Sequence, residues 1–223
     1  NISKQKYSIS SWSSKTPKRN SINVLEIKDT YKTIDQPTEE ILFKEKNSKF
    51  FGYAFPVTTT DEVKIYIEQL KKQHFGAVHF CYAYQIGTEK IEFRANDDGE
   101  PSNSAGIPIY GQIQAFDVTN ILVVSVRYFG GTKLGVGGLM SAYKTSAQLI
   151  LETSEIVEKI VNEQFKIYFT YEMMNRVSRI LKQYDVDVTH QKLEVSCEYT
   201  ISIRKKDALK IFEIFNEMYP IAI

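Results

Sequence analysis

A glycine-rich segment between a buried strand and a helix carries the residues best suited to hold an anion. It runs from Arg127 to Leu139 and contains Gly130, Gly131, Gly135, Gly137 and Gly138. Glycine lets the backbone approach a ligand closely or take a positive φ, and free amides at the start of the next helix favour negative charge. Arg127 and Lys133 add positive charge. The segment predicts an anion- or nucleic-acid-binding site; the alternative is a tight connection that needs glycine only for steric reasons.

The spacing within this segment excludes two common nucleotide-binding motifs. No Gly-Lys-Ser/Thr sequence closes it, as a Walker loop requires. Gly135, Gly137 and Gly138 do not match Gly-x-Gly-x-x-Gly either. The prediction therefore depends on charge, glycine content and the helix start rather than on a known nucleotide-binding motif.

A second segment concentrates carboxylates, with Asp97, Asp98 and Glu100 inside four residues. Such a group could hold a metal ion or act as acid and base, but the spaced ligands of a calcium loop are absent. We expect first a structural ion-pair cluster with Arg127 or Lys133, second a ligand-binding loop, and last a metal site. No metal and no cofactor is predicted.

A third segment, His79 to Tyr84, alternates as a strand and places His79 and Cys81 on one face. A Cys–His nucleophile pair is one interpretation, but no orienting partner is recognisable in the sequence. The His-x-Glu and Pro-Cys-x-x-Cys motifs of zinc deaminases are absent as well. Cysteine is most often a small buried apolar residue, so we expect both residues to line a core or a pocket. No residue is assigned a catalytic role, and an enzyme is the less favoured class.

Strands and helices around these segments predict a first domain over residues 38–152. Strand patterns cover residues 49–57, 79–86, 91–95 and 121–128, and the last is apolar enough to be buried on both faces. Thr59 and Glu62 form a capping box before a helix whose apolar residues end at Leu70. A second helix is indicated from Leu139 to Ile150.

A charged stretch over residues 152–162 predicts a linker, followed by a second domain over residues 163–223. Its expected elements alternate as strand, helix, strand, strand, helix and strand, at residues 165–171, 173–184, 186–188, 193–203, 209–218 and 219–223. This βαββαβ order is that of a ferredoxin-like fold. The predicted fold class is therefore α+β.

Composition is that of a globular protein in a reducing compartment. With 28 basic and 27 acidic residues, nucleic-acid binding would need a local patch. Two cysteines exclude a disulfide framework and a Cys-rich zinc site. No apolar run approaches the ~20 residues needed to span a bilayer, so we expect a cytoplasmic location. Residues 1–30 predict a disordered basic tail, either a cloning or annotation remnant or an arm that touches RNA.

Together the three segments resemble the YigZ/IMPACT family. The matching stretches are Ala77–Tyr84, Asp97–Pro101, Ala105–Ile109 and, most specifically, Val126–Tyr143. The resemblance implies a first domain with the fold of the second domain of a small-subunit ribosomal protein, which also occurs as the fourth domain of elongation factor G. It implies a ferredoxin-like second domain similar to that factor's fifth domain. Eukaryotic members of the family regulate translation by binding the activator of a starvation-response kinase.

The resemblance favours a cytoplasmic, translation-associated regulatory protein of the stress response. We expect it to bind RNA, the ribosome or a translation-regulating protein, without catalysis. The alternative is an enzyme or sensor of a small phosphorylated ligand held by the glycine-rich segment, since sugar and mevalonate-type kinases share the fold. A basic stripe across both domains would favour RNA. A pocket bounded by Gly130–Gly138 and Asp97–Glu100 would favour the small ligand.

Overall fold

A computed structural model describes residues 29–218, 221 and 223, and it shows an α+β fold. The described residues form three antiparallel sheets, with the strand orders β1-β7, β2-β3-β6-β4-β5 and β8-β10-β9. The strands are β1 (Thr30–Ile34), β2 (Ile41–Glu45), β3 (Ser48–Pro56), β4 (His79–Ile86), β5 (Glu92–Asn96), β6 (Ile121–Tyr128), β7 (Ile156–Ile160), β8 (Asn162–Phe169), β9 (Asp187–Leu193) and β10 (Cys197–Arg204). The helices are α1 (Thr60–Gln73), α2 (Gly106–Ala115), α3 (Gly135–Thr153), the short η1 (Tyr171–Met173), α4 (Met174–Gln183) and α5 (Lys205–Asn216). Among the described residues, no helix is long and apolar enough to cross a bilayer.

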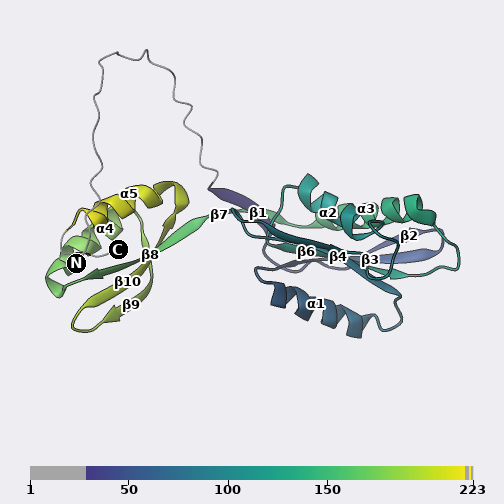
Figure 1. Cartoon of the computed structure of the whole chain (residues 1–223), viewed down its shortest axis with the longest axis horizontal. Coiled ribbons are helices and arrows are strands. Elements are labelled where there is room, and N and C mark those ends of the chain that lie inside the picture. Colours follow the sequence, from purple (N-terminus) through teal and green to yellow (C-terminus); the bar gives the residue numbers. More distant parts are fainter. Residues whose placement is uncertain (1–28, 219–220, 222) are drawn as a thin grey trace, which may run out of the picture.

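Helices cover both faces of the five-stranded sheet. Figure 1 shows α1 on one face and α2 and α3 on the other. Each face has its own core, with Phe50 and Tyr143 on the α2–α3 side and Leu70 and Val126 on the α1 side. The central strand β6 is buried from Ile121 to Arg127, which confirms the prediction of a strand buried on both faces.

Several elements of this part match the sequence-based prediction. β4 and β6 have the predicted bounds, while β3 and β5 are shifted by one residue. The capping box is present: the Thr59 hydroxyl accepts from the Glu62 amide, and the Glu62 carboxylate accepts from the Thr59 amide. α3 begins at Gly135, four residues before the predicted start, so part of the glycine-rich segment is helical.

The sequence pattern does not predict β2 or α2. α2 contains two glycines and Pro108, residue types of low helix propensity. Pro108 lies in the first turn, where its missing N–H leaves no helical hydrogen bond unmade. Ile109 and Ile113 on the same helix are fully buried. Burial against the sheet therefore overrides weak local propensity.

The charged stretch over residues 152–162 is not a linker, because its middle part, Ile156–Ile160, forms β7. β7 pairs with β1 over five residue pairs, which satisfies backbone groups that a free linker would leave to water. The predicted tail also ends too late. Thr30 already belongs to β1, and the Asp29 carboxylate accepts two hydrogen bonds from Arg204 of the last sheet. The rest of the tail, residues 1–28, lies outside the described residues.

After β7, the chain forms the sheet β8-β10-β9, with α4 and α5 on one face (Figure 1). Its core, which includes Ile167, Ile201 and Phe215, shares no residue with the two cores described above. Five of the six expected elements occur in the expected order, and the closing strand falls largely outside the described residues. The domain boundaries at residues 38–152 and 163–223 stay predictions.

One strand of this part is predicted wrongly at its start. The alternation from residue 193 to 203 continues through a hairpin turn, since β9 ends at Leu193 and β10 begins at Cys197. Val195 in the turn is fully exposed. A period of two cannot distinguish a continuous strand from a short turn whose residues happen to keep the period.

Candidate functional site

The three predicted segments meet at one end of the five-stranded sheet. The start of β4, the loop after β5, the end of β6 and the start of α3 line a hollow of about 400 Å³, here called the glycine-loop pocket. Its charged and polar lining residues are His79, Glu100, Arg127 and Lys133, and Phe129 is among its apolar ones. The pocket thus combines a small set of polar groups with apolar walls, as ligand sites commonly do.

A buried ion pair forms part of the pocket's lining. Nη1 of Arg127 lies 2.6 Å from Oε1 of Glu100, and the two side chains are only 6% and 4% exposed. The Tyr143 hydroxyl donates to the same carboxylate oxygen at 2.7 Å. Nε2 of His79 lies 3.9 Å from it. The predicted pairing of the acidic segment with Arg127 is therefore present, and Glu100 is the acid that makes it.

Asp97 and Asp98 do not take part in this ion pair, and in that respect the predicted cluster is wrong. The Asp97 carboxylate accepts hydrogen bonds from the amides of Asn103, Ala105 and Gly106, at the start of α2. The Asp98 carboxylate accepts from the Phe80 amide at 2.7 Å. Both carboxylates therefore act on the backbone.

Arg127, which the sequence places in the predicted anion site, has no guanidinium edge free to bind a phosphate. Nη1 is bound to Glu100, and Nη2 donates to Ser48 at 3.4 Å. The guanidinium lies 5.6 and 5.7 Å from the ring centres of Phe50 and Phe129. Its Nε is buried with no hydrogen-bond partner among the described residues. Arg127 thus balances Glu100, and any anion must be held mainly by other groups.

His79 and Cys81 are held by separate backbone carbonyls. His79 Nδ1 donates to the Asp98 carbonyl at 2.7 Å, and the Cys81 thiol donates to the Asp97 carbonyl at 3.0 Å. Cys81 is fully buried, and this burial raises the pKa of its thiol well above the usual range. A thiol that stays protonated is a poor nucleophile. His79 lines the pocket, whereas Cys81 belongs to the core.

The glycines of the loop are required for different physical reasons. A Cβ on Gly130 would lie 2.0 Å from the Asn47 carbonyl carbon, so close backbone approach requires glycine there. Gly131 and Gly135 have positive φ of 83° and 73°. Gly137 needs glycine neither for close packing nor for its backbone angle, since nothing lies within 4 Å of an added Cβ and its φ is not positive. The steric explanation therefore accounts for only part of the segment.

Two groups at the pocket remain free to bind an anion. Lys133 is exposed and makes no ion pair or hydrogen bond with a described residue. α3 has no side-chain cap and no acidic residue in its first turn. The first amides of a helix lack intrahelical partners and favour negative charge. Lys133 and the start of α3 therefore provide positive potential on one side of the glycine-loop pocket.

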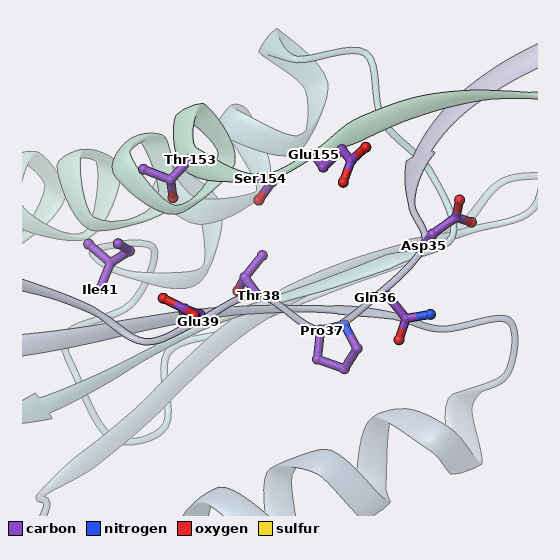
Figure 2. Close-up of a pocket in the computed structure, with 9 residues that line it drawn as sticks. All are labelled: Asp35, Gln36, Pro37, Thr38, Glu39, Ile41, Thr153, Ser154 and Glu155. Atoms are coloured by element: carbon purple, nitrogen blue, oxygen red, sulfur yellow. The ribbon is translucent and has the colours of Figure 1, made fainter.

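A larger hollow lies elsewhere and contains none of the predicted site residues. It measures about 480 Å³ and lies between the segment after β1 and the end of α3. Figure 2 shows three acidic side chains around it, Asp35, Glu39 and Glu155. They come from stretches more than 100 residues apart, so no local sequence signal could have found this hollow. Size alone does not make it the better candidate, because the glycine-loop pocket is where the chemically distinctive segments converge.

A buried polar network, which no sequence pattern predicts, lies on the α1 side of the sheet. The Tyr53 hydroxyl donates to the Glu40 carboxylate and accepts from His74 Nε2. Nδ1 of His74 accepts from the Tyr128 hydroxyl at 3.1 Å. These partners satisfy a neutral imidazole. Burial lowers the pKa of His74, and the Glu40 charge only partly opposes this shift.

The folded protein should lose stability when His74 must take up a proton. The pKa of His74 in the folded protein lies below its value near 6.5 in the unfolded chain. The stability that the neutral His74 side chain contributes is therefore fully present above about pH 6.5, and it is lost as the pH falls through the lower, folded-state pKa. We expect the free energy of unfolding to drop less between pH 7.5 and 5.5 in His74→Gln than in the original protein. Urea unfolding at both pH values measures this. An equal drop in both proteins would exclude His74 as the titrating group.

Known proteins are similar in sequence to most of this chain. The Impact N-terminal domain matches residues 46–151. The IMPACT family member YvyE of Bacillus subtilis (strain 168) is 30% identical over 189 residues, which cover 85% of this chain and 87% of the relative. The IMPACT family member YigZ of Escherichia coli (strain K12) is 29% identical over 142 residues, covering 63% of this chain and 70% of YigZ.

A solved structure shares the fold. The crystal structure of a hypothetical protein aligns with a TM-score of 0.67 and 21% identity, over 88% of this chain and 97% of that one. The matched Impact N-terminal domain includes every element that lines the glycine-loop pocket. Because YvyE is 30% identical to this chain and the match covers 87% of YvyE, the chain belongs to the IMPACT family.

Proposed function

We propose that this IMPACT family member is a non-catalytic binding protein that holds the phosphate-bearing part of a nucleotide in the glycine-loop pocket. The observation that carries the proposal is the convergence of three features in one hollow. Lys133 and the uncapped start of α3 supply positive potential. The half-exposed ring of Phe129 offers a flat apolar surface for a base.

Two kinds of ligand carry a phosphate beside a base: a free nucleotide and a nucleotide within an RNA chain. Residues 1–28 hold six of the 28 basic residues and one of the 27 acidic ones, so residues 29–223 carry 22 basic and 26 acidic residues. This balance gives residues 29–223 no general attraction for RNA. Binding of either source therefore depends on local groups such as Lys133.

The wider role that we propose is regulation of translation in the cytoplasm. Its support is the resemblance to the YigZ/IMPACT family, which implies a first domain with the fold of the second domain of a small-subunit ribosomal protein and of the fourth domain of elongation factor G. The second domain would correspond to that factor's ferredoxin-like fifth domain, and the predicted domain boundaries belong to the same proposal. Function depends on the site rather than on the fold, so the test of this proposal is binding at the glycine-loop pocket.

Lys133→Ala should weaken nucleotide binding without affecting folding. A charge-assisted contact to phosphate contributes on the order of 1.5–3 kcal/mol, so we expect roughly tenfold weaker binding or more. A panel of nucleoside mono-, di- and triphosphates, measured by the rise in melting temperature, tests the free source. A labelled single-stranded RNA, measured by anisotropy at several salt concentrations, tests the polymer, whose log–log salt slope should fall by about 0.7 in the variant.

The matched control is Lys144→Ala, which removes the same charge from the exposed side of α3, outside the pocket lining. It should bind as the original protein does. If neither nucleotides nor RNA bind the original protein, or if Lys133→Ala and Lys144→Ala have equal effects, the pocket is not the phosphate site.

A further inference from the structure

The solvent face of α4 carries positive charges that have no partner. The helix contains Arg176, Arg179 and Lys182 and no acidic residue. All three residues are exposed. None of them makes an ion pair or a hydrogen bond with a residue in the described part of the chain. Here they are called the α4 cations.

Helix geometry brings the α4 cations to one side. A step of three residues turns an α-helix by about −60°, so the three side chains lie within an arc of about 120°. Val177 and Leu181 are buried, and they project from the opposite side of the helix into the core. The helix therefore turns its apolar side to the protein and its charged side to solvent.

The other face of the same sheet differs, because its lysines are neutralised. Lys166 on β8 pairs with Glu198 at 2.8 Å, and Lys192 on β9 pairs with Glu194 at 3.1 Å. The α4 cations thus stay exposed and without a partner among the described residues, in a folded region whose acidic residues outnumber its basic ones. Unpaired charge of one sign favours a partner of the opposite sign.

We propose that the α4 cations bind the phosphate backbone of single-stranded RNA. This inference rests on the RNA source of the function proposed above and assigns it a second surface, separate from the glycine-loop pocket. Two of the three cations are arginines, whose planar fork matches phosphate. Tyr171, one short turn before α4, is 54% exposed and offers a ring on which a base can stack.

The buried apolar side of α4 argues against the other polyanion of the cell, an anionic membrane. A helix that lies in a membrane surface must insert an apolar face. Val177 and Leu181 are already committed to the core of the sheet. RNA requires no apolar insertion, because backbone contacts and stacking suffice.

The test compares the full chain with a triple variant, Arg176→Ala, Arg179→Ala and Lys182→Ala. Anisotropy with a labelled single-stranded oligouridine, titrated at several salt concentrations, gives the log–log salt slope. Each lost phosphate contact lowers that slope by about 0.7, so the triple variant should lose about 2. The control removes two paired cations from the opposite face of the sheet, by Lys166→Ala and Lys192→Ala, and should leave the slope unchanged.

Two further measurements, free-nucleotide binding and competition by polyglutamate, separate the outcomes. Free-nucleotide binding to the triple variant should stay as in the original protein, because that readout depends on the glycine-loop pocket. A triple variant that keeps the original salt slope would overturn the role of α4 and leave the pocket intact. Displacement of the RNA by polyglutamate at equal charge concentration would overturn the assignment to RNA, since charge alone would then explain binding.

Discussion

Replacing Glu100 by methionine should lower the free energy of unfolding by about 3–5 kcal/mol. Methionine has a similar volume, so the main effect is to leave the Arg127 guanidinium buried without its counter-charge. The Tyr143 hydroxyl loses its acceptor at the same time. Urea unfolding followed by circular dichroism measures the change. Glu68→Met on the exposed face of α1 is the control, and it should stay within about 0.5 kcal/mol.

A double-mutant cycle shows whether the loss comes from the ion pair. Arg127→Met alone should also destabilise the protein, because it leaves a buried carboxylate. The double variant should lose clearly less than the sum of the two single changes, since two apolar side chains can replace a buried pair at little cost. The coupling of Arg127 with Asp98, which the sequence also allows, should be the smaller one. Additive losses for Glu100 and Arg127 would contradict the pairing.

Gly130→Ala should be the most damaging change in the glycine-rich loop, at about 3 kcal/mol or more. The added Cβ would lie 2.0 Å from the carbonyl carbon and 2.2 Å from the carbonyl oxygen of Asn47. Both are backbone atoms of the turn between β2 and β3, so relief requires movement of one segment. Displacement would also break the hydrogen bond from the Gly130 amide to Ser48. Thermal unfolding of the purified variant checks the prediction.

Gly137→Ala is the matched control in the same loop, and its effect should have the opposite sign. Position 137 lies in the first turn of α3 with open space around it, so alanine should stabilise the protein by about 0.5–1 kcal/mol. If both alanine variants destabilise the protein alike, close packing at Gly130 is not the cause.

Local patterns account for the elements that were predicted well. The continuous apolar run of β6 and the capping box at Thr59 depend on neighbours a few residues away, so the sequence suffices to recognise them. α2 escapes prediction because its stability comes from buried contacts of Ile109 and Ile113 with the sheet, while its own residues have weak helix propensity. β7 escapes because its partner β1 lies more than 100 residues earlier.

For the candidate site, the sequence by itself determined the residue types: a glycine-rich loop, two bases beside it and three nearby acids. Only the tertiary structure decided their roles. Positive φ values of 41° at Asp98 and 86° at Gly99 turn the chain between the three acids. Asp97 and Asp98 therefore meet backbone amides, while Glu100 alone reaches Arg127. The charge and spacing of a side chain limit the kinds of group that it can bind. Which group it does bind depends on the distant segments that the fold brings within hydrogen-bonding distance.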